Sequence, residues 1–477
     1  MRQPSGTNPA RALLAILTAG TVVRLLAAAT IPLLDDEAHY WVWSRHLMWG
    51  FPDHPPMIAG LVWLGTRLIG DSILGIRLMP VVFGTATTLA VYAFTSRVFS
   101  ARAGLRAALL AQVIPAFAAS GIMAAPDAAL GLYWMLAMLF GWMALVEERR
   151  WAWVPAGVMT GLVVQCKLAG GALALSLAGL VLCSREYRRW LRTPGPYLAL
   201  LAGAVVVAPL AWWNLTHEWA TVRRAFVIDA WVHPTGIIGN VATFVGSQFV
   251  YYAPLGFPIL AAGLVAAFRL RRDARLRYLW WCAAPTLIVV LFGSLRALAK
   301  PHYTGPALIA GLIAAAALWT SWSWQRTLRL GLVTSAGLTI LVLAVAAVPN
   351  PLLRQLHEES RGWPDVAREV ERVLPTLGRP GETFVLAETY QAGSQLAFAT
   401  RNRVPVVVPF RGFDLWEPPT KWINRNGLLM DHLGGQAFAS MAATFERLEV
   451  PYPVRLRAGA EVRLYPGIRF QGFATRR

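Results

Sequence analysis

The sequence predicts a polytopic α-helical membrane protein that ends in a small α/β domain. Of its 477 residues, 56% are apolar and only 14% are charged, whereas soluble domains carry about 25% charged residues. Long uncharged runs such as ALLAQVIPAFAASGIMAA follow one another, and they approach the ~20 residues that cross a bilayer as a helix. From Asn350 the composition changes, so we expect a transmembrane domain over residues 1–349 and a second domain over residues 350–477.

The transmembrane domain is expected to hold about 11 spans, by the length that a bilayer requires. The N-terminal apolar segment is too long for a signal peptide and acids follow it, so it is taken as a retained first span. Arginine-rich segments connect alternate spans, which places them and the N-terminus in the cytoplasm and everything after residue 350 outside. The expected spans are 12–33, 76–96, 107–124, 128–146, 152–167, 170–183, 196–213, 253–268, 278–294, 304–320 and 328–349.

The outer loop from Leu33 to about Gly75 is predicted to contain two amphipathic helices, AHYWVWSRHLM and PPMIAGLVWLGTRLIG. Their aromatic residues fit an ordinary interfacial belt equally well. In the C-terminal domain, WPDVAREVERVLPTL reads as a helix, TFVLAE and VPVVVPF as strands with the helix YQAGSQLAFAT between them, and EVRLYPGIRFQGF as a closing hairpin. No phosphate-binding loop of a nucleotide-driven pump occurs in the sequence.

The net charge of +19 comes from 44 basic and 25 acidic residues. Because the basic residues follow the membrane topology, no nucleic-acid partner is expected. The three cysteines, Cys166, Cys183 and Cys282, lie in apolar segments without metal-ligand or disulfide spacing. We therefore expect no metal or other cofactor, although a divalent cation stays open.

Carboxylates gather on the predicted outer side. Asp35, Asp36 and Glu37 follow the first span directly, and crowding of like charges beside a low-dielectric surface favours a general base. The alternative is a solvated acidic cap on the next helix, whose positive N-terminus favours acids. Asp127, in the short outer turn MAAPDAALG, is a second candidate and is equally suited to be the N-cap of the helix after Pro126.

Lysine is rare in this chain, with only Lys167, Lys300 and Lys421 among the 44 basic residues. Lys167 ends an apolar helix in VVQCKLAGG, and Lys300 lies in SLRALAKPHYTGP beside Arg296, His302 and Tyr303. An ammonium group is a compact point charge that suits a phosphate oxygen, so two lysines at one membrane level favour an anion site. The alternative is that both side chains extend towards lipid headgroups.

Arg24 lies inside the first span. A charge within a membrane segment is a candidate functional residue, although it also fits a pair with a carboxylate elsewhere in the bundle. Together, the carboxylates and cations at the outer boundary suit a lipid-linked phosphate donor whose tail stays in the membrane while its headgroup reacts outside.

Several motifs resemble GT-C glycosyltransferases, in particular the bacterial branch related to protein O-mannosyltransferases and lipid A aminoarabinose transferases (families 39 and 83). They are DDEAHYWVW with FPDHPPM, then APDAAL, CKLAGGAL, NLTHEWAT, SLRALAKPHYTGPA and LAETYQAGSQLAF, in the family's order and over most of the chain. The resemblance implies transfer of a sugar from a polyprenyl phosphate to an acceptor hydroxyl outside the cytoplasm, usually with inversion.

The same resemblance implies roles for individual residues. The first-loop aspartate of the family matches Asp36, and its second carboxylate matches Asp127. Two departures concern the phosphate contacts: aminoarabinose transferases have lysine where this chain has His54, and many relatives have an acid where it has Lys300.

The sequence thus predicts an enzyme that transfers a sugar from a polyprenyl-phosphate donor to a hydroxyl or phosphate of lipid A, a glycan, a lipid or a protein. It is expected to act as a monomer at the periplasmic face of the inner membrane, by inverting single displacement, with its site residues in one pocket. The alternatives are a flippase for lipid-linked sugars, against which no internal repeat is found, and a phosphatase or ligase. The predicted residues are Asp36 as base, Glu37 and Asp127 as orienting acids, Lys167, Lys300, His302, His54, Arg296 and Arg24 for the donor phosphate, and Asp53, Tyr40 and Tyr303 for substrate.

Overall fold

The computed structural model describes most of the chain and divides it into two compact units. Unit 1 consists of residues 1–29, 49–58 and 77–344, and unit 2 of residues 30–48, 59–76 and 345–477. The described residues are 8–226, 236–296, 299–321, 325–348, 354–409, 412–432, 435–455 and 461–473.

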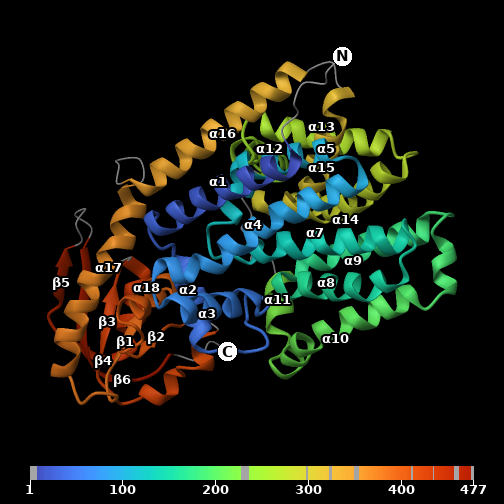
Figure 1. The fold of residues 1–477 in the computed structure, drawn as a ribbon. Helices are drawn as coiled ribbons and strands as arrows, with labels where there is room; N and C mark the ends of the chain where they lie inside the picture. The colour runs from blue at the N-terminus through green and yellow to red at the C-terminus, as the bar shows by residue number, and fades with distance from the viewer. Residues whose placement is uncertain are drawn as a thin grey trace. The chain divides into compact units, whose positions relative to one another are not determined.

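Unit 1 is a bundle of α-helices (Figure 1). Its helices are α1 (Pro9–Thr30), α4 (Ile73–Val98), α5 (Ala101–Val113), α6 (Pro115–Ser120), α7 (Pro126–Leu145), α8 (Trp153–Cys166), α9 (Ala172–Cys183), α10 (Gly195–Thr216), α11 (Ala220–Phe226), α12 (Gly236–Tyr251), α13 (Gly256–Arg269), α14 (Ala274–Arg296), α15 (Gly305–Leu318) and α16 (Gln325–Ala347), with short 3-10 turns that include η2 (Leu168–Gly171) and η4 (Pro301–Thr304).

Length and hydropathy make this a multi-pass membrane protein. Within the described residues, seven helices are long and apolar enough to span a bilayer: α1, α4, α7, α10, α14, α15 with its flanking turns, and α16. The pair α12 and α13 adds an eighth as a span bent by 109°. The predicted spans at 107–124, 152–167 and 170–183 coincide with shorter helices, because Pro115 ends α5 and an extended residue at Lys167 ends α8.

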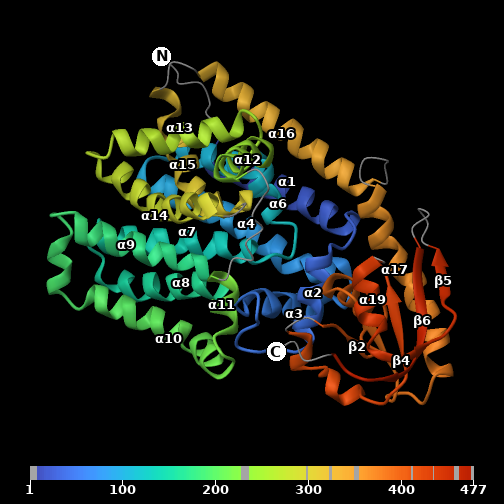
Figure 2. The ribbon, with the colours of Figure 1, turned by 180° about the vertical axis from the view of Figure 1, so that it is seen from behind.

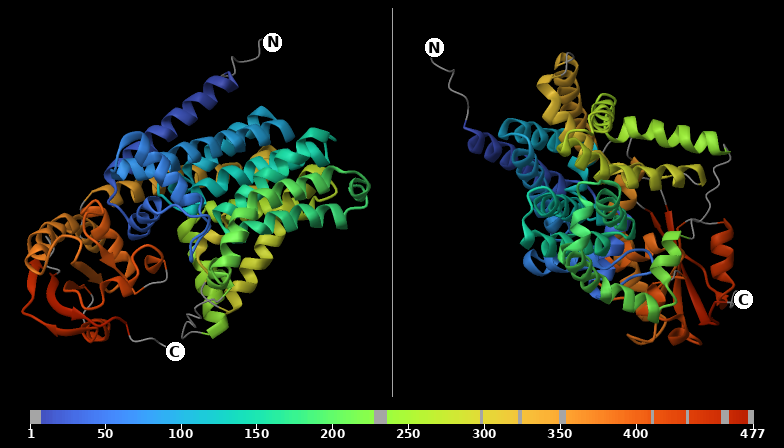
Figure 3. Two further views of the ribbon diagram at one scale, coloured as in Figure 1. Left: turned by 90° about the horizontal axis from the view of Figure 1, so that it is seen from below. Right: turned by 90° about the vertical axis from the view of Figure 1, so that its right-hand side faces the viewer.

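Small residues let the helices of unit 1 approach closely. A Cβ atom added at Gly157 of α8 would lie 2.0 Å from the Ala199 carbonyl oxygen of α10, and one at Gly263 of α13 would lie 2.0 Å from the Gly311 carbonyl of α15. Such contacts are typical of helix packing in lipid, where no hydrophobic effect drives helices together. These neighbours lie side by side in Figures 1 and 3.

Unit 2 combines the first-loop helices with the C-terminal part of the chain. The two predicted amphipathic segments form α2 (Asp35–Arg45) and α3 (Met57–Ile69). The remaining helices are α17 (Arg354–Val373), α18 (Tyr390–Ala399) and α19 (Gly435–Ala442) (Figure 2). The predicted domain boundary at residue 350 lies in a segment outside the described residues and stays a prediction.

The described part of unit 2 contains one six-stranded mixed sheet of order β2-β1-β3-β6-β4, with β5 also paired to β6. Its strands are β1 (Phe384–Ala387), β2 (Val406–Val407), β3 (Gly427–Asp431), β4 (Phe445–Leu448), β5 (Tyr452–Arg455) and β6 (Glu461–Phe470). The predicted closing hairpin is wrong: residues 461–470 form one continuous strand, because β3, β4 and β5 all pair with it. The predicted strands TFVLAE and VPVVVPF are confirmed as β1 and β2, which pair in parallel.

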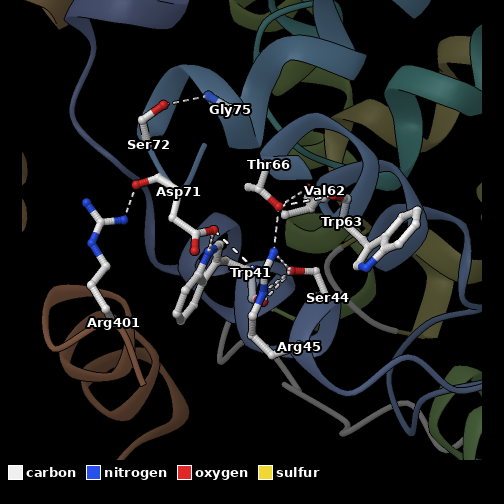
Figure 4. Close-up of polar contacts among 10 residues, drawn as sticks. All are labelled: Trp41, Ser44, Arg45, Val62, Trp63, Thr66, Asp71, Ser72, Gly75 and Arg401. Atoms are coloured by element: carbon white, nitrogen blue, oxygen red, sulfur yellow. Dashed lines mark hydrogen bonds and ion pairs between the residues drawn. The ribbon is translucent and has the colours of Figure 1, made fainter. Parts of the chain in front are cut away.

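Asp71 joins three helices of unit 2 (Figure 4). Its carboxylate accepts a hydrogen bond of 3.0 Å from the Trp41 indole and lies 3.3 Å from the Arg45 guanidinium. Arg401, just after α18, donates to the Asp71 carbonyl oxygen, and Arg45 also donates to the Thr66 hydroxyl of α3 at 2.5 Å. The Asp71 carboxylate therefore binds two residues of α2, its carbonyl oxygen binds Arg401 after α18, and Arg45 links α2 to α3.

Candidate active site

The acidic turn, defined as Asp35, Asp36 and Glu37, forms the first turn of α2 in unit 2. Asp35 and Asp36 are exposed, whereas Glu37 is only 1% exposed and its carboxylate accepts a hydrogen bond of 3.0 Å from the Leu34 amide. Glu37 therefore satisfies an unpaired amide at the start of the helix, as a capping acid does. Of the three carboxylates, Glu37 fits the cap interpretation, and the other two face solvent.

Helix α18 supplies neutral donors to the two exposed carboxylates. The Tyr390 hydroxyl donates to Asp36 Oδ1 at 3.0 Å, and Gln395 Nε2 donates to Asp35 Oδ1 at 2.9 Å. Gln395 also donates to the Leu33 carbonyl at 3.2 Å. Because these donors carry no charge, they orient the carboxylates without neutralising them. Both side chains lie in the block LAETYQAGSQLAF, in which the sequence predicts no role for the tyrosine or the glutamine.

The next turn of α2 is packed against the same helix. Tyr40 is 6% exposed, and its ring lies 5.3 Å from that of Trp43. His39 Nδ1 lies 3.1 Å from the Ser394 hydroxyl, and its ring is 4.8 Å from that of Tyr390. These contacts fix α2 on α18. The predicted role of Tyr40 in substrate binding stays a prediction.

The charged cluster, defined as His54, Asp127, Lys167, Lys300 and His302, lies in unit 1. At its centre Lys167 Nζ lies 3.3 Å from Asp127 Oδ1 and 3.5 Å from Oδ2. Both ends of this pair are positioned by helix ends, since Asp127 is the second residue of α7 and Lys167 is the extended residue between α8 and η2. The N-cap of α7 is Ala125, so the Asp127 carboxylate is used for the ion pair rather than as the cap.

The aromatic ring of Tyr303 also contacts Lys167. The ammonium nitrogen lies 4.7 Å from the centroid of the Tyr303 ring, a cation–π contact. Tyr303 is 38% exposed and contacts the ring of His302 at 4.7 Å in an edge-on arrangement. The predicted residues Lys167, Asp127, His302 and Tyr303 are thus brought together from three separate parts of the sequence.

His54 is uncharged at neutral pH. Burial is the largest cause that lowers the pKa of His54 to about 4, and the Lys167 ammonium adds to it. Lys300 and His302 lower this pKa further, whereas Asp127 raises it. Positive charge therefore exceeds negative charge around the imidazole, as expected of a site that receives an anion.

The loop that carries His54 is tied to α10 and α11. The Phe51 amide donates to the His54 carbonyl at 3.1 Å, and the Thr221 hydroxyl donates to the Phe51 carbonyl at 2.7 Å. The buried Asn214 side chain accepts from the Thr221 amide at 3.1 Å. Asp53, predicted to bind substrate, lies 3.3 Å from Arg224 Nε. The DHPP segment is therefore held in place by the NLTHEWAT segment.

A buried hydrogen-bonded group supports His302 and Tyr303 from the side of α12. Thr304, the last residue of η4, donates to Gln248 Oε1 at 2.7 Å, and its hydroxyl lies 3.2 Å from that of Tyr252. The adjacent Tyr251 ring lies 6.5 Å from that of His302. These residues are not among those predicted from the sequence, although two polar residues in apolar surroundings, here Gln248 and Thr304, are a signal that marks such a site.

A cavity of about 60 Å³ extends from the charged cluster into the bundle. Its lining includes Asp127 and His302 of the charged cluster, Tyr251 of α12 and Arg24 of α1. Arg24 is 3% exposed. The side chain of Arg296, also predicted to bind the donor phosphate, lies outside the described residues.

No group of three or more His, Cys, Asp or Glu side chains with the geometry of a metal site occurs within the described ranges. The expectation of a metal-independent enzyme is untested by this observation and stays a prediction.

The fold and the charged cluster define a multi-pass membrane protein with a cation-rich site beside apolar helices, and comparison with known proteins identifies its class. Residues 53–213 match the family described as dolichyl-phosphate-mannose-protein mannosyltransferase. The lipid A galacturonosyltransferase RgtD of Rhizobium johnstonii is 28% identical over 388 residues, which are 78% of this chain and 79% of that protein.

Two solved structures share the fold. ArnT from Cupriavidus metallidurans, bound to undecaprenyl phosphate, superposes with a TM-score of 0.67 and 18% identity over 95% of this chain and 97% of that one. The oligosaccharyltransferase of Archaeoglobus fulgidus, in complex with Zn and sulfate, gives a TM-score of 0.52 and 16% identity over 87% of this chain and 67% of that one. With the family match and the similarity to RgtD, these findings identify the chain as a glycosyltransferase of the GT-C fold.

Proposed function

We propose that this glycosyltransferase moves a sugar from a polyprenyl-phosphate carrier to a hydroxyl or phosphate group of lipid A, at the periplasmic face of the inner membrane. The observation that carries the proposal is the charged cluster, in which Lys167 is paired with Asp127 beside His54 and Lys300. Two comparisons support it, since ArnT is bound to undecaprenyl phosphate and RgtD acts on lipid A.

The charged cluster suits a phosphate leaving group. A lipid-linked phosphate brings a negative charge to the edge of the bilayer, where desolvation strengthens its attraction to ammonium groups. Lys167 and Lys300 supply positive charge, and the imidazoles of His54 and His302 can donate N–H hydrogen bonds. Asp127 balances Lys167 when the site holds no phosphate, which limits the cost of keeping the cation desolvated.

The proposed reaction is a single displacement. The acceptor oxygen forms a bond to the anomeric carbon while the bond from that carbon to the phosphate oxygen breaks, so the configuration inverts. The carrier phosphate leaves with the electron pair and is stabilised by Lys167 and Lys300. Asp36, held by Tyr390 at 3.0 Å, takes the proton of an acceptor hydroxyl, a step that typically contributes 10²- to about 10⁴-fold.

The test uses the purified full-length protein in lipid nanodiscs with undecaprenyl-phosphate sugars labelled in the sugar and with lipid A as acceptor. The proposal expects label in lipid A, one undecaprenyl phosphate released per sugar transferred, and inverted anomeric configuration. The Asp36→Asn protein is the matched control. Label that stays on the carrier, or appears only as free sugar, would contradict the proposal, and movement of intact carrier across the bilayer would favour a flippase.

A further inference from the structure

A second cavity, of about 130 Å³, lies within unit 2 and is called the unit 2 cavity below. It shares no lining residue with the cavity of unit 1. Its wall is formed by the end of α2, the end of α18 with the turn after it, β2, and the 3-10 turn η8 (Phe413–Leu415) with the residues that follow. None of these lining residues belongs to the acidic turn or the charged cluster, so the proposed reaction gives the unit 2 cavity no role.

Two stacked aromatic rings form one part of the wall. The His46 imidazole, just after α2, is nearly parallel to the Trp416 indole, with ring centroids 5.0 Å apart and an interplanar angle of 8°. The buried Phe413 ring lies 5.3 Å from that of Trp416. His46 and Trp416 are only half-buried. Because the face of an aromatic ring is electronegative, it attracts the polarised C–H groups on the face of a sugar ring.

Polar side chains of several types line the same space. Asn402 provides an amide, Arg403 a guanidinium and Glu417 a carboxylate. Burial lowers the pKa of His46, so its imidazole is neutral at pH 7 and adds one donor and one acceptor. The wall therefore offers both donors and acceptors. A hydroxyl group can donate and accept at once, so a ligand rich in hydroxyls matches this wall.

The two charged side chains of the wall already have partners of opposite charge. Arg403 Nη2 lies 2.8 Å from Glu371 Oε1. Glu417 Oε1 accepts hydrogen bonds from Lys421 Nζ at 2.7 Å and from the Trp422 indole at 2.8 Å. Among the described residues that line the unit 2 cavity, no charge is thus left to select an ion. In this respect the cavity differs from the charged cluster, and it suits an uncharged ligand.

The turn between α18 and β2 is held in an unusual backbone conformation. Arg401 and Asn402 have φ angles of 54° and 57°, in the left-handed region that arginine rarely adopts and asparagine tolerates. Arg401 donates to the Asp71 carbonyl oxygen, and the Asn402 backbone amide donates to the Ala397 carbonyl at 2.8 Å. The turn places Asn402 and Arg403 in the cavity wall. Backbone strain of this kind is concentrated at functional sites.

The size and place of the cavity indicate which part of a ligand it holds. Its volume of about 130 Å³ accommodates about ten atoms the size of water, at roughly 10–15 Å³ for each, which corresponds to one sugar ring. Asp36 lies in the first turn of α2 and His46 follows the last residue of this helix. The helical rise therefore separates them by about 15 Å, a distance that an oligosaccharide spans and a single sugar does not.

We propose that the unit 2 cavity binds an uncharged sugar residue of the acceptor, at a distance from the sugar that is modified. The acceptor glycan then extends along α2, with the reacting hydroxyl at Asp36 and the bound residue between the Trp416 ring and the polar side chains of the wall. This inference rests on the proposed function, because it takes Asp36 as the site of the reaction. It makes the cavity a determinant of acceptor length.

The experiment compares two acceptors with the same donor and purified full-length protein in nanodiscs. The short acceptor is lipid A that carries only the acidic inner sugars of the core oligosaccharide, and the long acceptor carries the uncharged core sugars as well. Wild-type protein is expected to have a KM about 10-fold lower for the long acceptor, the combined range of a ring contact and a hydrogen bond. Equal KM values for the two acceptors would overturn the inference.

Two variants test the cavity wall. Trp416→Ala should raise the KM for the long acceptor by about 10-fold and leave the short acceptor unchanged. Asn402→Gly removes the side-chain amide, and glycine adopts the positive φ of this position without strain; the KM for the long acceptor should rise by about 3-fold. The matched control is Trp63→Ala, which removes an exposed tryptophan of α3 that does not line the cavity, and both KM values should stay at the wild-type level.

Transfer to the short acceptor also shows that each variant is folded. Equal losses on both acceptors in Trp416→Ala and Asn402→Gly would assign the wall a structural role and contradict the inference. If wild-type protein uses both acceptors equally well, the inference fails and the proposed function stands. If it transfers sugar from the carrier to neither acceptor, the proposed function fails and the inference fails with it.

Discussion

The acidic turn of unit 2 and the charged cluster of unit 1 place carboxylates in opposite surroundings. Asp36 is exposed and accepts a hydrogen bond from the neutral Tyr390 hydroxyl, whereas Asp127 is paired with the Lys167 ammonium. A carboxylate held by a neutral donor keeps its full negative charge, while one paired with a cation is already neutralised. In the proposed function the two acids therefore have separate roles, Asp36 as a proton acceptor and Asp127 as the partner of a phosphate-binding lysine.

The largest expected effect comes from Asp36→Asn. It removes the proton acceptor and should lower kcat by about 10²- to 10⁴-fold, the usual contribution of general-base catalysis. Steady-state transfer to lipid A measures it, with Asp35→Asn as the matched control, since that residue is hydrogen-bonded to Gln395 in the same turn. Wild-type turnover by Asp36→Asn, with loss of turnover in Asp35→Asn, would reverse the assignment.

The second-largest effect is expected from replacing Lys167, the central cation of the charged cluster. Lys167→Met should raise the KM for the polyprenyl-phosphate donor by about 10- to 100-fold, as expected when a charged hydrogen bond is lost. Acceptor KM should change little. Lys421→Met is the matched control, because that lysine pairs with Glu417 in unit 2 at 2.7 Å. An unchanged donor KM in Lys167→Met would remove the charged cluster from donor binding.

Tyr390→Phe removes one hydroxyl and tests whether Tyr390 positions the Asp36 carboxylate. The Asp36 carboxylate then loses its neutral donor, and kcat should fall by about 3- to 10-fold, the range of one hydrogen bond. Because Tyr390 acts through Asp36, donor KM should stay at the wild-type value. A change in donor KM with unchanged kcat would show that Tyr390 contacts substrate instead of positioning the base.

The smallest effect is a pH dependence. Burial and the Lys167 ammonium lower the pKa of His54 to about 4, so the imidazole loses its proton as the pH rises through 4 and is neutral from pH 5 to 8. The pH–activity profile of His54→Gln should then have the wild-type shape over that range. In Lys167→Met, removal of the ammonium should raise the His54 titration midpoint, measured by the pH dependence of its NMR signals. A midpoint near the ordinary 6.5 in wild-type protein would contradict the electrostatic description of the cluster.

Much of the architecture follows from the sequence alone. Hydropathy predicts the helices of unit 1 because lipid selects apolar segments of a set length. Short apolar runs predict β1 and β2. The two helices predicted in the first loop are present as α2 and α3, although Glu37–Ser44 of α2 are buried on every face instead of being amphipathic. The prediction fails at residues 461–470, since the number of partners of a strand depends on segments distant in the sequence, here β3, β4 and β5.

The charged residues of the site could be predicted from the sequence, but the uncharged residues that position them could not. Asp127 and Lys167 stand out because charges are rare in apolar segments, and the structure pairs them. Tyr390 and Gln248 carry no charge and lie far in sequence from the residues they hold. Their roles depend on tertiary packing, which local patterns do not encode.

The most direct measurement of this division of roles is equilibrium binding of undecaprenyl phosphate to wild-type, Asp36→Asn and Lys167→Met proteins in nanodiscs. This ligand carries the phosphate and no sugar, so it reports on the leaving-group site alone. We predict wild-type affinity in Asp36→Asn and a loss of about 10- to 100-fold in Lys167→Met. Intact binding in Lys167→Met, together with lost binding in Asp36→Asn, would contradict the account.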